Sequence, residues 1–480
     1  MSLGSDVRQR PLTAFPARSD PSVAAAAAGQ RLHRNGPDIV FRSVTTGPTH
    51  SNQPPPRPPR WIWAVPFPSK VPPLTRPQWK VLGLLSAAEF FDHYDMGIMS
   101  LALLQIQAGL SIPEESVGLL AGLVRLGAVP AFAFAVLADR MGRRRLLLIT
   151  ILGFTVSTFA TSMVQTAEQF VALQFISRMF IYAETMLAAV VLAEELDAEH
   201  RGWGIGMLGA LGALGHGLSA IVFGFVEWLP FGWRAMYAIG FLPMAFLAWF
   251  RRSLPETKRF KEQQSQRRDR GDWLDWFHPI TQLVRMYPRR LAALCAAVFP
   301  LDFVIITAVT LMAKTLQEVH GYAPGEVTLL YIVGGAFGIL GNLAAGVLSD
   351  RLGRRRVVVF LIVLAAFSFY GFYNLSGWII VPIWIAQVFS TMGLSVLFKA
   401  MGSELFPTSY RSTAAGVRTI AGILGAFTGL YLEGPLYELT GSHAGAITLM
   451  LPVLVVPAFV VMAFLPETAT RELEDISPER

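Results

Sequence analysis

The stretch Asp139-Arg-Met-Gly-Arg-Arg-Arg145 decides how this chain is organised, because it occurs twice. It returns as Asp350-Arg-Leu-Gly-Arg-Arg-Arg356, after a shift of 211 positions (350 minus 139). A second and unrelated motif, Leu254-Pro-Glu-Thr257, returns after the same shift as Leu465-Pro-Glu-Thr468. Two motifs that share one offset indicate that the chain consists of two related halves.

Apolar stretches of membrane-spanning length surround these motifs. Of the 480 residues, 53% are hydrophobic and 15% are charged, whereas about 25% of the residues in soluble proteins are charged. Between about Val81 and Phe464 we count twelve apolar stretches long enough to cross a bilayer. Only helices suit such stretches, because lipid offers no hydrogen-bond partner to an open backbone. The sequence therefore predicts an all-α integral membrane protein with twelve transmembrane helices in two parallel six-helix repeats.

The linkers between the apolar stretches differ in charge. The linkers at residues 140–145, 251–290 and 351–356 are rich in arginine, while the alternate linkers carry glutamates such as Glu114 and Glu438. By the positive-inside rule, both termini are then cytoplasmic. We therefore expect a multi-pass protein of the plasma (inner) membrane, and we attribute the net charge of +7 to topology rather than to nucleic-acid binding.

The predicted domain organisation has five parts. Residues 1–78 are rich in Pro, Ser, Ala and Arg and cannot bury a core, which predicts a disordered cytoplasmic tail. Residues 79–252 and 290–468 are the two six-helix bundles, and residues 469–480 are a second cytoplasmic tail. The linker, residues 253–289, is predicted to hold an amphipathic helix on the inner membrane surface. Its apolar residues at helical spacing are Trp273, Trp276, Phe277, Ile280, Leu283 and Val284.

Three carboxyl side chains lie in the first membrane span, at Glu89, Asp92 and Asp95. Their spacing of i, i+3 and i+6 distributes them along one flank of a helix. Ionisable residues at this depth are costly and usually functional, so we expect them to face a cavity, pair with cations or hold protons. A proton-coupled carrier needs a carboxyl that loads a proton on one side and releases it on the other. The alternative is that each carboxylate is paired with an arginine for structure alone.

Arg125 and Arg178 lie about ten residues into the second and fourth spans. A guanidinium stays charged and presents a planar fork suited to carboxylate or phosphate, so either arginine could bind an anionic substrate. Equally, they could neutralise buried carboxylates such as Glu184, because buried charges are normally paired. Asp302 is the second half's counterpart of Asp92. We assign these residues and the carboxylates of the first span to a central cavity between the halves.

Other ionisable residues in the spans favour structural roles. Lys314 and Lys399 lie near span ends, so we expect their ammonium groups to snorkel toward water. His93 and His216 lie in apolar spans, where a lone histidine is more often a hydrogen-bonded packing residue than a titrating site.

Several kinds of chemistry have no signal in this sequence. The single cysteine, Cys295, excludes a disulfide framework and a Cys-x-x-Cys redox pair. The sequence contains no P-loop, no His-Glu-x-x-His zinc motif and no Gly-x-Ser-x-Gly elbow. We therefore expect no enzymatic activity, no metal, no cofactor, no use of ATP and no nucleic-acid partner, and we expect a monomer in the lipid bilayer.

The doubled loop and the doubled Pro-Glu-Thr tag resemble those of the major facilitator superfamily, over roughly Val81 to Thr468. Glu404-Leu-Phe-Pro-Thr-Ser-Tyr-Arg411 resembles the sugar-porter branch, and Asp92-His-Tyr-Asp95 is similar to a signature of aromatic-acid/proton symporters. The resemblance implies alternating access, with the loops stabilising the outward-facing state and Arg411 or Arg418 as partner of Asp139. The loop residues with this implied role are Asp139, Arg140, Gly142, Arg143, Asp350, Arg351, Gly353, Arg354 and Arg411.

These observations together predict a secondary active transporter that works by alternating access. We expect proton-coupled uptake of an organic acid or a sugar-like metabolite, with an acid favoured over a sugar. Its partners are then a small-molecule substrate, protons and the lipid bilayer. Two alternatives stay open: proton-driven efflux of a drug or metabolite, and a non-transporting membrane sensor with a carrier fold.

Overall fold

The computed structural model describes residues 59, 71–197, 199–252, 278–407 and 409–469, which all belong to the compact unit Pro55–Arg480. All regular elements of this described part are helical. The first half comprises α1 (Arg76–Leu101), α2 (Leu103–Leu110), α3 (Glu114–Leu126), α4 (Ala128–Met141), α5 (Arg143–Thr161), α6 (Ala167–Glu195), α7 (Arg201–Phe223) and α8 (Trp233–Arg251). The rest comprises α10 (His278–Met286), α11 (Pro288–Glu318), α12 (Pro324–Leu352), α13 (Arg354–Asn374), α14 (Ile380–Glu404), α15 (Arg411–Thr440), α16 (His443–Met450), the 3-10 turn η3 (Leu451–Leu454) and α17 (Val455–Phe464).

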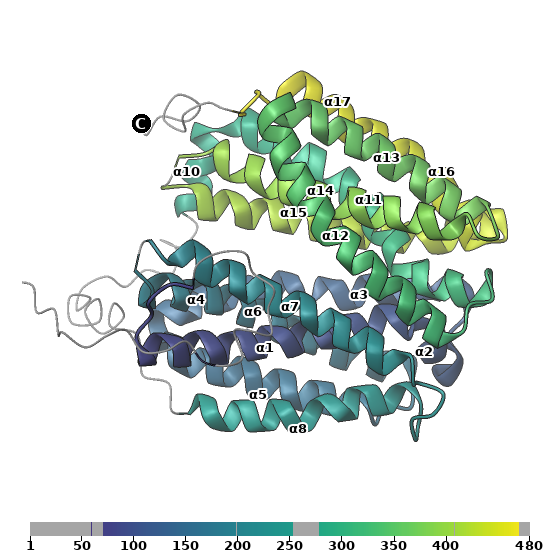
Figure 1. The fold of residues 1–480 in the computed structure, drawn as a ribbon, viewed down its shortest axis with the longest axis horizontal. Helices are drawn as coiled ribbons and strands as arrows, with labels where there is room; N and C mark the ends of the chain where they lie inside the picture. Colours follow the sequence, from purple (N-terminus) through teal and green to yellow (C-terminus); the bar gives the residue numbers. More distant parts are fainter. Residues whose placement is uncertain (1–58, 60–70, 198, 253–277, 408, 470–480) are drawn as a thin grey trace, which may run out of the picture. The chain divides into compact units, whose positions relative to one another are not determined.

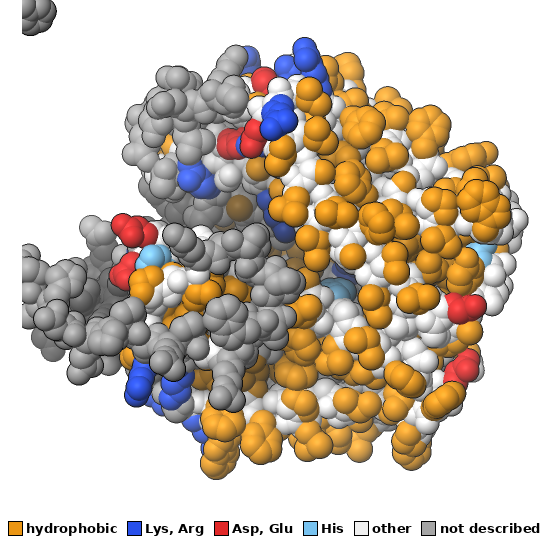
Figure 2. All heavy atoms as spheres, in the orientation of Figure 1, with side chains coloured by type: hydrophobic (Ala, Val, Ile, Leu, Met, Phe, Trp, Pro, Cys, Tyr) orange, Lys and Arg blue, Asp and Glu red, His pale blue; other side chains and the backbone are white. Residues whose placement is uncertain are grey.

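Eleven helical segments of the described part are long and apolar enough to cross a membrane. They include α3 continued into α4, and α16 continued into α17. The twelfth crossing is α1, whose 26 residues are long enough but include the three carboxyl side chains noted above. The prediction of twelve transmembrane helices is confirmed. Hydrophobic side chains cover most of the described surface seen in Figure 2, as contact with lipid requires.

The two repeated loops adopt the same backbone conformation. Gly142, between α4 and α5, has φ 92° and ψ 146°, and Gly353, between α12 and α13, has φ 95° and ψ 141°. Side chains rarely tolerate this positive φ, so glycine lets one helix end and the next begin without a longer loop. The repeat seen in the sequence is therefore also a repeat of the backbone.

Each half is built around the same kind of helix pair, and Figure 1 shows α1–α8 in one bundle and α11–α17 in another. In the first half α1 packs along α7, and in the second half α11 packs along α15. A Cβ added to Gly215 would overlap the carbonyl of Phe90, and one added to Gly425 would overlap the carbonyl of Phe299. Glycine at these positions lets the helix backbones approach closely.

The halves contact each other chiefly through α3 with α15 and through α7 with α12. Hydrogen bonds between them gather away from the repeated loops. The amide of Gln105 donates to Gln317 at 2.6 Å, and the hydroxyl of Thr328 donates to the carbonyl of Ala220 at 2.6 Å. We call this end, where α2 ends and α3, α12 and α16 begin, the distal end, and the opposite end, with the repeated loops, the loop end.

The helix α10 falls within the predicted amphipathic segment. Its Leu283 is fully buried and its Val284 is exposed, and the helix contacts α11 and α15. The prediction for residues 273–277 lies outside the described residues, as do those for residues 470–480 and for most of residues 1–78. The helical bundles begin slightly earlier than predicted, at Arg76 and Pro288.

Candidate functional site

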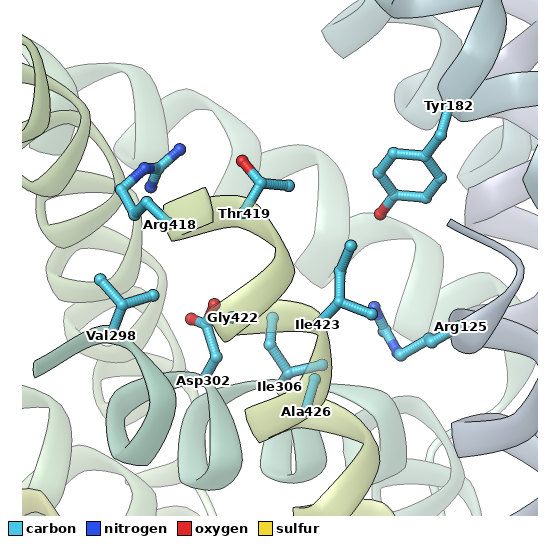
Figure 3. Close-up of a pocket in the computed structure, with 10 residues that line it drawn as sticks. All are labelled: Arg125, Tyr182, Val298, Asp302, Ile306, Arg418, Thr419, Gly422, Ile423 and Ala426. Atoms are coloured by element: carbon cyan, nitrogen blue, oxygen red, sulfur yellow. The ribbon is translucent and has the colours of Figure 1, made fainter. Parts of the chain in front are cut away.

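A cavity of about 150 Å³ lies between the two halves. Helices α3 and α6 of the first half and α11 and α15 of the second half line it. An engineered protein cavity of about this volume binds benzene, so the space suits a molecule with a single small ring. The lining residues, drawn in Figure 3, are Arg125, Tyr182, Val298, Asp302, Ile306, Arg418, Thr419, Gly422, Ile423 and Ala426.

The charged groups of the cavity come from both halves. Arg125 belongs to α3, whereas Arg418 belongs to α15, and Figure 3 shows them on different sides of the cavity. Asp302 of α11 lies against Gly422, one turn beyond Arg418, since a Cβ added to this glycine would overlap the carboxylate. Two guanidinium groups outnumber one carboxyl, so the cavity is electropositive whether or not Asp302 carries a proton. Such a cavity favours an anionic ligand.

Arg125 also joins the two halves directly. Its Nη2 donates a hydrogen bond to the hydroxyl of Thr310 on α11 at 3.1 Å. The same hydroxyl donates to the carbonyl of Ile306 at 2.7 Å, so it uses its proton there and accepts from the arginine. A guanidinium has five N–H donors, which leaves others for a ligand in the cavity.

The three carboxyl groups of α1 are buried inside the first half and do not line the cavity. Asp92 is 0% exposed, and neither of its oxygens has a hydrogen-bond partner among the described residues. Asp95 accepts from the hydroxyl of Thr158 at 3.0 Å, and Glu89 accepts from the hydroxyl of Thr185 at 3.1 Å. Because an ionised carboxylate without a donor is costly in apolar surroundings, Asp92 is well suited to carrying a proton.

Glu184 also lies inside the first half, with a partner that the sequence did not identify. Its carboxylate forms an ion pair with Arg251 and accepts from the hydroxyl of Thr150. From the sequence, Arg251 belongs to the start of the basic linker. In the structure α8 continues through this residue, and its side chain is fully buried. Glu184 is therefore a paired internal charge and not a residue of the cavity wall.

Arg178 and His93, two further polar residues of the first half, lie beside or on α1. Arg178 is buried, with its Nη2 3.8 Å from the sulfur of Met99, and it does not line the cavity. A ring nitrogen of His93 lies 3.0 Å from the carbonyl oxygen of Glu89, and its ring is 5.1 Å from that of His216. Hydrogen bonding and ring packing are what the sequence led us to expect of His93.

The prediction that Lys314 snorkels toward water is wrong. Its side chain is 0% exposed, and its ammonium group lies 2.9 Å from Glu114 and also pairs with Glu318. Hydropathy alone places this lysine near a span end, but α11 extends to Glu318 and turns the side chain inward.

At the loop end, arginines of both repeated loops form ion pairs within their own halves. Arg143 pairs with Glu194 at 3.2 Å. Arg354 pairs with Asp350 at 2.9 Å and with Glu404 at 2.8 Å.

The side chains of Asp139 and Arg140 lie outside the described part of the structure, so their predicted roles, including a contact of Asp139 with Arg411, stay predictions. The other candidate partner of Asp139, Arg418, is found in the cavity wall.

The sequence did not single out Tyr182 or Thr419 as lining residues. A signal was nevertheless present in span eleven, because Arg418, Gly422 and Ala426 recur at intervals of four and so share one helix face. Such a stripe becomes informative only once it is known which face of the helix meets the other half.

Two related six-helix halves that enclose a polar cavity define the architecture of a secondary transporter. The family model described as Major Facilitator Superfamily matches residues 85–341 and 292–479, and the chain belongs to this superfamily.

The chain is similar to named transporters over most of its length. It is 27% identical over 345 residues to the probable 4-methylmuconolactone transporter of Cupriavidus pinatubonensis, which covers 68% of this chain and 76% of that protein. It is 25% identical over 409 residues to the putative niacin/nicotinamide transporter NiaP of Bacillus subtilis, covering 83% and 98%. The inward-open structure of the xylose transporter XylE from E. coli shares the fold, with a TM-score of 0.66 and 17% identity, covering 83% of this chain and 99% of that chain.

Proposed function

We propose that this protein imports a small organic acid together with protons across the plasma (inner) membrane, with both of its termini in the cytoplasm. The observation that carries this proposal is the cavity to which each half contributes one guanidinium, from Arg125 and from Arg418. Arginine binds carboxylates through two parallel hydrogen bonds. A carboxylate held by both arginines would draw the halves together around the substrate, as alternating access requires.

The size of the cavity and the names of the relatives support a compact cyclic acid. A volume of about 150 Å³ suits one small ring. The relative named for niacin and nicotinamide supports a compound with one small ring, and of these two only niacin carries the carboxylate that the two arginines would bind. We therefore propose nicotinate and benzoate as probes, with nicotinamide as an uncharged compound of nearly the same shape.

We place proton coupling on Asp92 and Asp95 of α1. Asp92 lacks a described hydrogen-bond donor, so gaining or losing a proton changes its electrostatic cost strongly. The helix that carries it contacts α6, α7 and α8 in its own half and α11 in the other half. A change of charge on α1 therefore acts at a helix that touches both halves.

The test is uptake into proteoliposomes with an imposed gradient, acidic outside. We expect nicotinate or benzoate to accumulate above the level in protein-free liposomes, which corrects for passive entry of the neutral acid. A protonophore should abolish this excess. Uptake that does not depend on the gradient would refute proton coupling. A preference for nicotinamide or xylose would refute an organic acid as the substrate. Extrusion of the acid under the same gradient would show that the protein is an exporter.

Substitutions in the cavity separate carboxylate recognition from general damage. We expect Arg125→Gln and Arg418→Gln each to weaken nicotinate binding about 10-fold or more, because a hydrogen bond to a charged group contributes about 1.5–3 kcal/mol. Binding of nicotinamide, if present, should change little. Arg285→Gln, at an exposed position on α10, is the matched control. Equal losses for the charged and the neutral compound would contradict recognition of the carboxylate by these arginines.

A further inference from the structure

Charged side chains of the two halves meet at the distal end. Glu114 is the first residue of α3 in the first half, while Lys314 of α11 and His443 of α16 belong to the second half. One carboxylate oxygen of Glu114, Oε2, lies 2.9 Å from Nζ of Lys314 and 2.9 Å from Nε2 of His443. A single carboxylate of the first half thus pairs with two basic side chains of the second half.

Each of these basic side chains also has a carboxylate partner in its own half. Lys314 pairs with Glu318, one turn later in α11. Nδ1 of His443 lies 2.6 Å from Oε1 of Glu433, on α15. Both ring nitrogens of His443 therefore face carboxylate oxygens, which only accept, and the ring satisfies both only as the imidazolium ion.

The charged groups at the distal end differ in their exposure to water, and this difference decides which of them can lose a partner when the halves separate. Lys314 and Glu433 are 0% exposed, whereas the side chain of Glu114 is 32% exposed. After separation Lys314 would keep Glu318, and His443 would keep Glu433. The buried charges of Lys314 and Glu433 would therefore stay paired, which matters because an unpaired buried charge is strongly unfavourable.

Glu114 alone would lose both partners, and its position makes that loss tolerable. It lies in the first turn of α3, where the helix dipole stabilises a negative charge. It is also partly open to water already, so hydration can replace its lost partners. The contact between the halves can therefore open without stranding a buried charge.

The same two helices meet a second time beside the cavity. Arg125 lies on α3 with Glu114, and its hydrogen-bond partner Thr310 lies one turn before Lys314 on α11. A ligand that draws Arg125 away from Thr310 would remove the inner of these two polar contacts. Of the two contacts described between α3 and α11, only the Glu114–Lys314 pair would then be left.

We propose that Glu114, Lys314 and His443 form a charge latch that holds the distal end closed and sets the fraction of molecules in this conformation. When the latch opens, Glu114 loses its contacts to Lys314 and His443. Glu318 and Glu433 then keep these two basic groups paired. The inference goes beyond the proposed function, because it concerns which arrangement of the halves is populated and not which solute is bound.

The test measures the distance across the distal end in the full chain, reconstituted in lipid nanodiscs without substrate. Spin labels are placed at Phe231→Cys and Leu439→Cys, two exposed positions at the distal end, one in each half, in a Cys295→Ala background. We expect Glu114→Gln to raise the ratio of open to closed molecules about 5-fold or more, which is the lower end of typical coupling effects.

Two matched variants show whether the effect belongs to the contact between the halves. Glu115→Gln removes an exposed neighbouring charge, and Glu318→Gln removes the partner that Lys314 has in its own half. Both should stay closed like the unaltered protein. A closed distribution for Glu114→Gln, or equal opening by Glu318→Gln, would overturn the latch. Should Glu114→Gln fail to insert, the double variant Lys314→Gln/His443→Gln removes both contacts from the other half, and a closed distribution there also overturns the latch.

Discussion

The guanidinium of Arg354 makes two hydrogen bonds to the carboxylate of Glu404, at 2.8 Å and 3.2 Å, and so ties the start of α13 to the end of α14. The hydroxyl of Thr468, from the second Pro-Glu-Thr tag, donates to the same carboxylate at 2.6 Å. The first half repeats the arginine contact, between Arg143 and Glu194. In the second half, the repeated loop and the repeated tag therefore meet at one ionic site.

We expect Glu404→Gln to slow transport about 10-fold while changing equilibrium substrate binding no more than a few-fold. The carboxylate lies at the loop end, away from the cavity, so its loss should alter the balance between arrangements of the halves and not the binding chemistry. Arg285→Gln is the control, because Arg285 lies at an exposed position on α10, outside the repeated loops. The test compares transport rates with substrate affinities measured by calorimetry. A loss of affinity as large as the loss of rate would contradict a role of Glu404 in the balance between the two arrangements.

A second prediction concerns the pH dependence of stability at Glu467. Burial raises the pKa of this carboxyl, but hydrogen bonds from four backbone N–H groups outweigh it and hold the pKa below the ordinary value of 4.5. Those groups belong to Ala469, Arg354, Arg355 and Thr468. With its pKa lowered by folding, Glu467 stabilises the protein above about pH 4.5, and this contribution is lost as the pH falls through the folded-state pKa.

Thermal unfolding in detergent tests the sign of this effect. We expect Glu467→Gln to unfold at a lower temperature than the unaltered protein at neutral pH. The gap between the two unfolding temperatures should narrow as the pH falls from 4.5 through the lower pKa of the folded state, where the carboxyl of the unaltered protein also becomes protonated. A gap that stays constant across this range would show that ionisation of Glu467 does not contribute.

The third prediction is that Asp92→Asn and Asp95→Asn each abolish accumulation driven by a proton gradient. An amide keeps the shape of the carboxyl but cannot cycle a proton. Exchange of labelled for unlabelled substrate without a gradient should survive, since it needs the carrier to move but no net proton transfer. Glu438→Gln, at an exposed position of α15, serves as control. Full gradient-driven accumulation in both aspartate variants would remove them from the coupling role.

The fourth prediction concerns the buried pair of Glu184 and Arg251. Arg251→Leu should lower the free energy of unfolding by about 3–5 kcal/mol, because it leaves Glu184 as an uncompensated buried charge. The double variant Glu184→Leu/Arg251→Leu should recover part of this loss, since both charges are then absent. Unfolding measured in detergent gives both values. If the double variant is less stable than Arg251→Leu alone, the pair is not the source of the effect.

The number of helices, the division into halves and the loop end were all predictable from the order of residues along the chain. Membrane crossing depends on the length and apolarity of single segments, and these are local properties that need no knowledge of neighbouring helices. The offset between the two Asp-Arg-x-Gly loops identified the repeat directly. The backbone angles of Gly142 and Gly353 then agree to within a few degrees.

The pairing of charges, by contrast, was decided by how the helices are rotated against one another. Arg251 reads as part of a basic linker, and Lys314 as a snorkelling residue, until α8 and α11 are seen to carry both side chains inward. Arg418 looked like a loop partner and proved to line the cavity. A sequence gives the depth of a side chain along its helix, but its direction depends on helix rotation and tilt, which only packing against the other helices sets.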